Sequence, residues 1–467
     1  MQAFLVLTGH ASVAIPPAAV LRGARSPCWR SPVLVHPVIC RLAERTLGSQ
    51  GGRAVHLFPQ NSSTVATSAD VDWGLARPPR VAIVHDWLVT YAGSERVLER
   101  LIGLFPQADV FALVDFLPQH ERGFLAGRPV RTSFLQKVPF ARRCYSKLLP
   151  LMPLAIEQFD LSGYDIVLSS SHCVAKGVLT GPTTLHVSYV HTAMRYAWDL
   201  QHEYLEGSNL ARGLRSVAAR WMLHKLRIWD VRSSYGVDAM VANSRFIARR
   251  IRKTYGRKAR VIYPPVDVEN FVPGGTKEDY YVTASRLVPY KRIDVLIDAF
   301  AQLPDRRLVV IGEGPQAAAL KARAGSNVTF LGLQDRDSLV RHMQRAKAFL
   351  FAAQEDFGIV LVEAQACGTP VIALGKGGAL ETVRGPEHAQ PTGLFFDSPT
   401  PASVAEAVHR FESSARLFTP AACRASAERF DSSVFDRRLL ALVERRWQAL
   451  RGTPRRPTQN FPSRHAA

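Results

Sequence analysis

Residues 80–105 read RVAIVHDWLVTYAGSERVLERLIGLF, and this stretch decides the fold class. Residues 81–84 form a continuous apolar run, which is typical of a strand buried on both faces. A polar loop that contains Gly93 follows, and residues 95–105 then place apolar side chains at helical spacing. The stretch therefore predicts a buried strand, a loop and a helix.

The same unit recurs along the chain on both sides of the rigid break Tyr263-Pro264-Pro265-Val266-Asp267. Short apolar strands that alternate with helices form parallel, doubly wound sheets. We therefore expect an α/β fold of two Rossmann-like halves joined by a Pro-containing linker; the resemblance named below implies that the two domains face each other across a cleft. The expected strands are 108–113, 166–170, 185–189 and 239–242 before the break, and 280–284, 307–311, 328–331, 348–352 and 371–374 after it.

Composition shifts predict the domain boundaries. Residues 1–78 are rich in Pro, Ser, Thr and Arg and show no sustained period, so we expect a disordered extension or a mis-assigned gene start. Residues 79–263 and 264–430 are the two expected domains. Apolar spacing within 431–452 predicts a closing helix that crosses back, and 453–467 reads as a disordered basic tail.

The composition narrows the function classes. The chain has 467 residues with 59 Lys plus Arg against 39 Asp plus Glu, a net charge of +20. No apolar run reaches the roughly 18 to 20 residues that a spanning helix needs, which excludes an integral membrane protein. The six scattered cysteines indicate reduced thiols in a cytosolic protein.

The positive charge has three readings. Lys and Arg do not gather around interleaved aromatics or a known module, so we expect no nucleic-acid partner. Their spread along helical segments suits an anionic membrane surface or phosphorylated ligands. A merely solvated basic surface remains the open alternative.

Ligands of open α/β sheets bind beyond the carboxyl ends of the strands. Ser285-Arg286-Leu287-Val288-Pro289-Tyr290-Lys291 follows the first strand of the second half. Arg286 and Lys291 can converge on one diphosphate, the first as a planar fork and the second as a point charge. A pair of solvent-facing bases is the alternative reading.

The second candidate segment is Glu355-Asp356-Phe357-Gly358-Ile359-Val360-Leu361-Val362-Glu363. Gly358 opens a helix, whose free backbone N–H groups suit an anion or a sugar. Glu355 lies in the loop, whereas Glu363 lies on an otherwise apolar helix. Because a buried carboxylate needs a partner, Glu363 points to function more than a surface acid would.

Two weaker candidates lie in the first half. Gly93 permits close approach of the backbone to a ligand, although a glycine before a helix is most often a turn. His191 ends a strand, where a histidine is more often structural than a ligand contact. Asp70-Val71-Asp72 and Asp335-Arg336-Asp337 resemble metal-binding Asp-x-Asp pairs, but we interpret both as structural, and we expect no metal.

Taken together, these segments resemble the retaining family 4 glycosyltransferases, which have the B-type (GT-B) fold of two Rossmann domains. The resemblance covers roughly residues 80–452. It narrows toward bacterial mannosyltransferases of O-antigen and exopolysaccharide assembly, and it departs at Ala92, where the family usually has glycine. Its further motifs are His85-Asp86-Trp87-Leu88, Ser169-Ser170-Ser171-His172, 187–199, Asn243-Ser244-Arg245-Phe246 and Gly312-Glu313-Gly314-Pro315.

The resemblance implies roles for these residues. Arg286 and Lys291 would neutralise the donor diphosphate as the glycosyl bond breaks, in place of a metal ion. Glu355 would hold the donor sugar, Glu363 the ribose hydroxyls, and His191 would approach the sugar from the other domain. The remaining donor contacts would be Phe357, Gly358, Ile359, Gly93 and Gly332, and the acceptor contacts Asp86 and Arg195.

The favoured hypothesis is a cofactor-free, metal-independent retaining transferase. It would move mannose from GDP-mannose to a lipid-linked or growing oligosaccharide in surface polysaccharide synthesis, at the inner face of the cytoplasmic membrane. A UDP-sugar donor, or an epimerase or phosphorylase on the same fold, is the enzyme alternative. An inactive basic protein that binds membrane or nucleic acid is the alternative of another class, and the intact Arg286, Lys291, Glu355 and Glu363 argue against it.

Overall fold

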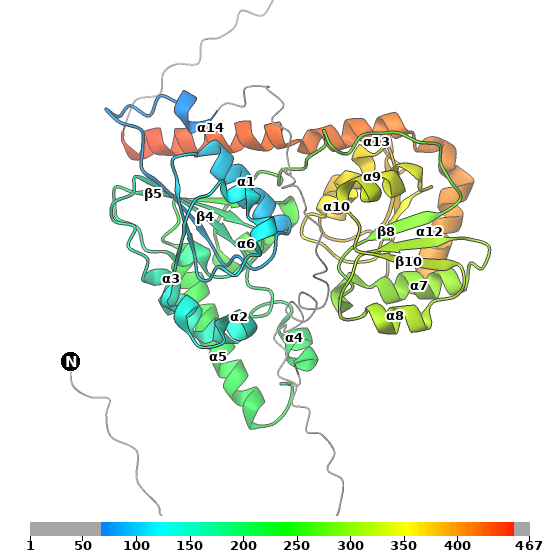
Figure 1. Cartoon of the computed structure of the whole chain (residues 1–467), viewed down its shortest axis with the longest axis horizontal. Coiled ribbons are helices and arrows are strands. Elements are labelled where there is room, and N and C mark those ends of the chain that lie inside the picture. The colour runs from blue at the N-terminus through cyan, green and yellow to red at the C-terminus, as the bar shows by residue number, and fades with distance from the viewer. Residues whose placement is uncertain (1–66, 209, 453–467) are drawn as a thin grey trace, which may run out of the picture. The chain divides into compact units, whose positions relative to one another are not determined.

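The computed structural model describes residues 67–208 and 210–452 and contains two parallel sheets (Figure 1). The first sheet has seven strands in the order β3-β2-β1-β4-β5-β6-β7. Chain order reverses on either side of β1, which is the switch-point arrangement of a doubly wound fold. Its strands are β1 Val81–His85, β2 Asp109–Ala112, β3 Val130–Thr132, β4 Ile166–Ser171, β5 Leu185–Val190, β6 Ala239–Ala242 and β7 Ala259–Val261.

Helices cover both faces of this sheet. Leu98 and Leu101 of α1 pack in the core of one face, and Ile156 of α3 and Leu226 of α5 pack in the core of the other. The central strands are buried along their whole length, so their apolar runs reflect two covered faces. The helices are α1 Gly93–Leu104, α2 Ala141–Cys144, α3 Met152–Glu157, α4 Gln201–Gly207, α5 Leu214–Ser234 and α6 Arg245–Tyr255.

The second sheet has six parallel strands in the order β10-β9-β8-β11-β12-β13. One face carries α7, α8 and α12, and the other carries α9, α10 and α13. Two Rossmann-like α/β domains are thus confirmed. The strands are β8 Tyr281–Ala284, β9 Leu308–Ile311, β10 Val328–Gly332, β11 Phe349–Phe351, β12 Val371–Leu374 and β13 Gly393–Phe396, and the helices are α7 Ile293–Ala301, α8 Ala317–Arg323, α9 Arg336–Arg345, α10 Ile359–Ala366, α11 Ala379–Thr382, α12 Pro401–Ser414 and α13 Pro420–Ala427.

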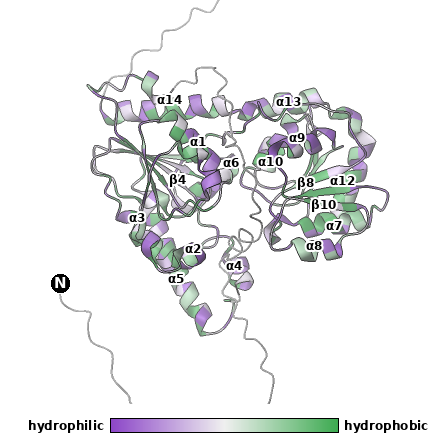
Figure 2. Cartoon of the chain, in the orientation of Figure 1, coloured by the Kyte–Doolittle hydropathy of each residue, from purple (hydrophilic) through white to green (hydrophobic). Residues whose placement is uncertain are grey.

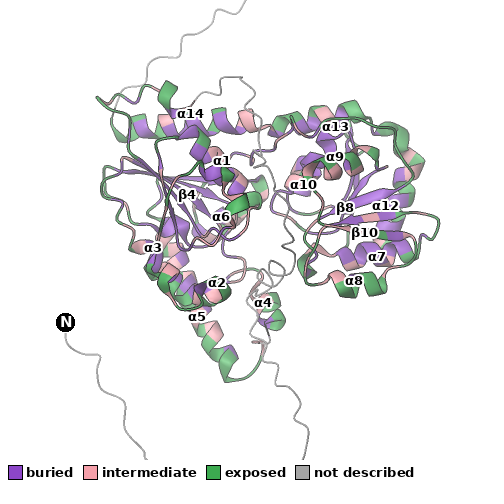
Figure 3. Cartoon of the chain, viewed as in Figure 1, coloured by how far each residue is buried: buried purple, intermediate pink, exposed green. Residues whose placement is uncertain are grey.

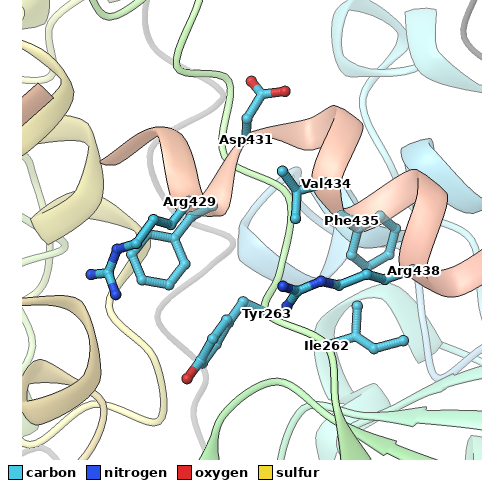
Figure 4. A pocket seen from close by; sticks show the side chains of 8 residues that line it. Ile262, Tyr263, Arg429, Asp431, Val434, Phe435 and Arg438 are labelled. Carbon is cyan, nitrogen blue, oxygen red and sulfur yellow. The ribbon is translucent and has the colours of Figure 1, made fainter. Parts of the chain in front are cut away.

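The chain returns to the first domain through α14, Ser432–Leu450, as the closing-helix prediction requires. Its apolar stripe, which includes Phe435 and Leu439, lies in the core of the first domain. Figure 2 shows hydrophilic and hydrophobic residues along α14, the pattern of a helix with one buried face. The linker pairs with the chain just before this helix, because Val266 N–H donates to Phe430 O at 3.0 Å. In Figure 4, Tyr263 of the linker lies between Arg429 and Arg438.

The predicted extension over 1–78 is wrong for residues 67–78, which fold onto the first domain. Trp73 is only 7% exposed and belongs to its core. The indole N–H of Trp447 on α14 donates to Trp73 O at 2.9 Å, and that of Trp73 donates to Ser68 O at 2.7 Å. The buried side chain of Trp73 and the hydrogen bonds of its indole N–H and its carbonyl oxygen thus fix this segment in spite of its polar composition. The rest of the predicted extension, and the tail 453–467, lie outside the described residues.

Burial follows the same three-layer plan in both domains, with buried strands between helices that are exposed on their outer sides (Figure 3). Among residues 67–208 and 210–452, no helix is both long and apolar enough to cross a membrane.

Candidate active site

The loops beyond β8 and β9 pack together at the carboxyl edge of the second sheet. Leu287 N–H donates to Glu313 O at 2.9 Å. A Cβ on Gly312 would lie 2.0 Å from Ser285 O, and one on Gly314 would lie 2.4 Å from Leu287 O. Only glycine fits at these two positions, so they fix the path of the loop that carries Arg286 and Lys291.

Lys291 and Glu355, two of the predicted catalytic residues, are in direct contact. Lys291 ends a short 3₁₀ turn, Pro289–Lys291, and its Nζ donates to Glu355 Oε1. The ammonium also lies 5.5 Å from the centroid of the Phe351 ring. Arg286 is exposed, and its side chain has no hydrogen bond or ion pair with another described residue. The structure thus brings a predicted cation and a predicted acid together from two distant segments, and their catalytic role stays a prediction.

The start of α10 presents unpaired backbone donors. Gly358 takes a left-handed φ of 87° and caps the helix. Within the described chain, the backbone N–H groups of residues 357–360 have no hydrogen-bond acceptor. The side chain of Phe357 is 3% exposed and packs on Tyr263 with ring centroids 5.6 Å apart, so only its backbone can meet a ligand. Free N–H groups at a helix start favour a phosphate or a sugar oxygen.

A glycine loop after β12 supports this segment, and the sequence interpretation missed it. Gly378 N–H donates to Glu355 O at 2.8 Å. A Cβ on Gly377 would lie 2.3 Å from Glu355 O, and one on Gly378 would lie 2.4 Å from Phe357 Cα. The run Gly375-Lys376-Gly377-Gly378 directly after a buried strand was the available signal.

Glu363 is buried, and its partner is a residue that we did not predict. Arg96 on α1 donates through Nη1 to Glu363 Oε1 at 2.5 Å, and the carboxylate raises the pKa of Arg96 above its usual value. The expectation that this acid needs a partner is confirmed. Nearby, a Cβ on Gly93 would lie 3.5 Å from Ile359 Cδ1, so the loop before α1 lies against the start of α10.

The segment after β5 reaches the same place through an arginine pair. Arg195 donates to Asp356, the neighbour of Glu355. Arg250 of α6 donates to Asp356 Oδ1 at 3.3 Å and to Thr192 Oγ1 at 3.0 Å. His191, which precedes Thr192, is therefore held on the strand end that faces this loop. The predicted contact of Arg195 with the acceptor stays a prediction, and its ion pair gives it a bridging role.

His191 itself is fixed by its backbone and its ring. Its N–H donates to Ser171 O at 2.8 Å, and its carbonyl accepts from Asn243 Nδ2 at 2.9 Å. The ring Nε2 lies 2.8 Å from Ser170 Oγ. Burial, followed by the nearby His172 and His85, lowers the pKa of His191 well below its ordinary value, so the imidazole is neutral near pH 7.

Asp86 does not fit the predicted acceptor contact. Its side chain is fully buried and accepts four backbone hydrogen bonds of 2.6 to 2.9 Å, from the N–H groups of residues 172–175. A carboxylate with two donors on each oxygen has no lone pair directed at a substrate. The acid after β1 therefore organises the loop after β4.

Gly332 lies at the end of β10 with a left-handed φ of 69°. Its carbonyl accepts from Gly312 N–H at 2.8 Å, which joins its loop to the one that packs on Ser285. Asp335, which we interpreted as structural, caps α9, since its side chain accepts from Ser338 N–H at 2.7 Å. Among the residues described, no group of three or more His, Cys, Asp or Glu side chains can hold a metal ion.

A basic cavity of about 790 Å³ adjoins the Arg250–Asp356 contact. Gln354 contributes to it from the second domain, and the other lining residues come from the first. The cationic ones are Arg227, Arg249, Arg250 and Lys253. A cavity with this lining favours an anionic or hydroxyl-rich ligand.

The chain is similar to known proteins in sequence and in fold. Residues 91–270 match the model of Glycosyltransferase Family 4, and residues 269–429 match the model of Glycosyl transferases group 1. The solved structure of HepE from Anabaena with UDP and glucose superposes with a TM-score of 0.55 at 20% identity, over 78% of this chain and 99% of that one. Sucrose-phosphate synthase from Thermosynechococcus elongatus gives 0.58 at 17% identity, over 79% and 100%.

The two domains have the fold of GT-B glycosyltransferase structures. The family 4 match in the first domain is followed directly along the chain by the group 1 match in the second.

Curated relatives match in part. The chain is 30% identical over 224 residues to a D-inositol 3-phosphate glycosyltransferase of Mycobacterium sp. strain KMS, which is 42% of this chain and 48% of the relative. It is 35% identical over 179 residues to a GDP-mannose-dependent monoacylated alpha-(1-6)-phosphatidylinositol monomannoside mannosyltransferase of Corynebacterium glutamicum, 32% and 47% respectively. The matched part thus spans about half the length of these relatives.

Proposed function

We propose that the chain is a metal-independent retaining glycosyltransferase that transfers mannose from GDP-mannose to a lipid-linked or growing oligosaccharide. The observation that carries the proposal is the contact of Lys291 with Glu355 beside the free N–H groups at the start of α10. A cation, an acid and an anion-binding helix start are the groups that a sugar diphosphate needs. These groups would also suffice for transfer from a sugar nucleotide without a cofactor.

The leaving diphosphate explains the cations. As the glycosyl bond breaks, negative charge grows on the phosphate oxygen that leaves. Lys291 and the exposed Arg286 would offset this charge together with the backbone N–H groups of residues 357–360. Because Glu355 shares the Lys291 ammonium, a bound diphosphate would loosen that pair and free the carboxylate to accept sugar hydroxyls.

The other groups would position the donor. Glu363 would accept the ribose hydroxyls, and His191 would approach the sugar from the end of β5. Retention would follow from attack on the face that the diphosphate leaves, with the phosphate taking the proton of the attacking hydroxyl. No protein nucleophile is then required, and the water-poor surroundings of buried Glu363 favour transfer over hydrolysis.

The choice of GDP-mannose is supported by one relative that is GDP-mannose-dependent by name. The test is to incubate the protein with GDP-mannose, UDP-glucose and UDP-N-acetylglucosamine and to measure nucleoside diphosphate release. GDP from GDP-mannose alone supports the proposal, and an α-linked product confirms retention by proton NMR. Release of UDP from a UDP-sugar alone would show that the donor is a UDP-sugar instead. A sugar nucleotide that is altered but not cleaved would indicate an epimerase. No turnover of any donor would favour the alternative of an inactive binding protein.

We propose further that the protein associates with the anionic inner face of the cytoplasmic membrane through α5. This helix buries Leu223 and Leu226, and part of α5 is exposed (Figure 3). Its side opposite to these leucines carries a second apolar stripe. The stripe consists of Leu214, Val217, Trp221 and Ile228, which are 90%, 66%, 63% and 54% exposed.

Basic side chains accompany this apolar stripe. Arg215, Lys225 and Arg232 of α5 are exposed, and the Lys225 ammonium lies 5.6 Å from the centroid of the Trp221 ring. An apolar stripe with a tryptophan and flanking cations fits the boundary between anionic headgroups and acyl chains. A lipid-linked acceptor would then meet the enzyme at the surface to which it binds.

Vesicle co-sedimentation tests this membrane face. Binding to phosphatidylglycerol-containing vesicles should exceed binding to pure phosphatidylcholine and should weaken as salt rises, because the attraction is screened over about 8 Å at physiological ionic strength. Trp221→Ala should weaken binding, whereas Leu417→Ser, at a 51% exposed leucine of the second domain, should not. Equal binding of both variants and the wild type would show that α5 is not the membrane-binding surface.

A further inference from the structure

A chain of buried hydrogen bonds connects His191 to the first turn of α1. Ser170 Oγ lies 2.8 Å from His191 Nε2 and 3.1 Å from His85 Nδ1. His85 Nε2 lies 3.3 Å from Glu95 Oε1. His85 and Ser170 are fully buried and Glu95 is 4% exposed, so this relay is closed to water between its two ends.

The carboxylate end gives the relay a direction. Glu95 Oε2 accepts from Ala92 N–H at 3.0 Å and from Ser94 Oγ at 2.9 Å. Burial alone would raise the pKa of Glu95, but the hydrogen bond with His85 helps to lower the pKa overall, so the group is ionised. An ionised carboxylate only accepts hydrogen bonds. When the His85 ring carries a single proton, that proton therefore lies on Nε2 and is donated to Glu95.

The remaining donors and acceptors then follow in order. Because His85 Nδ1 has no proton, it accepts from the hydroxyl of Ser170. That hydroxyl has a single proton, so its oxygen accepts from His191 Nε2–H. A neutral imidazole carries one proton, and Nδ1 of His191 is left as a bare lone pair.

We propose that Glu95, His85 and Ser170 are positioning residues that hold His191 in its Nε2–H tautomer, so that Nδ1 meets the reacting sugar or acceptor as a hydrogen-bond acceptor. This inference rests on the proposed function for the identity of the substrate and on the relay alone for the tautomer. A lone pair at this place accepts a hydroxyl proton, whereas the opposite tautomer would donate to a hydroxyl oxygen. The relay therefore selects which hydroxyl orientation is bound.

The rings around the relay do not compete for its protons. The His172 centroid lies 6.0 Å from that of His85 and 6.3 Å from that of His191, and no hydrogen bond joins its ring to either of these described rings. Tyr189 packs edge-on against His191 at 5.1 Å, while its hydroxyl donates to Ile262 O at 2.9 Å.

Glu95→Gln tests the direction of the relay with minimal change of shape. The amide oxygen would keep the bonds from Ala92 and Ser94, which turns the amide NH₂ toward His85 Nε2. His85 must then accept at Nε2 and donate from Nδ1 to Ser170, whose hydroxyl proton points at His191 Nε2. The proton of His191 would therefore move to Nδ1.

Histidine-selective ¹⁵N labelling and long-range ¹H–¹⁵N NMR at pH 8, without donor, reports the tautomer. The signals of His191 are assigned by their loss in His191→Gln. We expect Nε2–H in the wild type and in the control Ser94→Ala, Nδ1–H in Glu95→Gln, and a tautomer mixture in Ser170→Ala. An Nδ1–H wild type, or an unchanged tautomer in both Glu95→Gln and Ser170→Ala, would overturn the inference.

Kinetics separate this positioning role from a structural one. Glu95→Gln and Ser170→Ala with wild-type circular dichroism should lower kcat by about tenfold or more, with donor KM nearly unchanged. Equal loss of kcat in Ser94→Ala would indicate a general disturbance of the α1 start instead. If the wild type turns over no sugar nucleotide, the proposed function fails, whereas the NMR result on the tautomer still stands or falls by itself.

Discussion

Arg96 of α1 donates a hydrogen bond to Glu363 of α10, and this contact ties the expected donor site to the other domain. The carboxylate is almost fully buried, whereas the guanidinium is 33% exposed. Removal of either partner therefore has unequal consequences. An isolated Arg96 can turn to water, but an isolated Glu363 stays buried and charged.

Arg96→Ala should destabilise the protein by about 1 to 3 kcal/mol, the usual penalty for a buried acceptor that loses its partner. Glu363→Gln should cost less, because the neutral amide no longer requires a cation. Urea unfolding of both single variants and of the double variant measures this. A double variant whose loss equals the sum of the two single losses would show that the pair is not coupled.

Trp73→Ala should lower the free energy of unfolding by about 3 kcal/mol, since it removes a buried indole and leaves a cavity. The polar composition of the segment before residue 78 would instead predict that the substitution leaves the stability unchanged. Arg77→Ala is the matched control in the same segment, because its ion pair with Asp165 is 55% exposed on the arginine side and should matter by less than about 1 kcal/mol. Similar melting temperatures for Trp73→Ala and Arg77→Ala would argue against the packing of residues 67–78.

Stability should fall as the pH drops from 6.5 toward 4, partly through His186. Burial lowers its pKa to about 4, against an ordinary value of 6.5, although its hydrogen bond to Gly236 O opposes the shift. Within this window the unfolded chain binds a proton that the folded protein does not, so stability is complete above 6.5 and is lost below it. The full loss from this side chain is about 3 kcal/mol. His186→Gln should flatten the dependence in urea unfolding at pH 7, 6 and 5, and an unchanged slope would count against the assignment.

Turnover of the donor should persist in excess EDTA. In the proposed mechanism the charge that offsets the leaving diphosphate would come from Lys291, Arg286 and backbone N–H groups, so no divalent ion would be needed. Activity is measured after dialysis against EDTA, with and without added Mg²⁺ or Mn²⁺. Complete loss that either ion restores would refute the metal-independent mechanism.

The central strands could be predicted because each is a short apolar run that needs no partner to be recognised. β3, Val130–Thr132, and β7, Ala259–Val261, were missed because they are three-residue strands at the sheet edges, half-exposed and without an apolar run. Residues 67–78 were misjudged because the fate of Trp73 depends on Trp447, which lies 374 positions away. Local composition carries no trace of such a contact.

Two charged residues of the candidate site could be predicted to lie together because each follows a strand that the sequence itself reveals. Lys291 and Glu355 follow separate buried strands of one parallel sheet, and parallel strands end at one edge. Arg96 was not predictable, because its contact with Glu363 depends on how two domains meet. The structural role of Asp86 could not be predicted, because the sequence is the same whether an acid after a strand faces a ligand or accepts hydrogen bonds from backbone N–H groups.

The most direct test compares donor turnover by Lys291→Ala and Glu363→Ala in the presence of EDTA. In the proposed mechanism Lys291 would face charge that grows as the bond breaks, so its loss should lower kcat by on the order of a hundredfold, about 3 kcal/mol. Glu363 would hold a ribose that does not change, so its loss should mainly raise the donor KM. Lys258→Ala, which removes an exposed lysine of the first domain, is the control and should match the wild type. GDP release from GDP-mannose at wild-type rates in both Lys291→Ala and Glu363→Ala would show that this is not the active site.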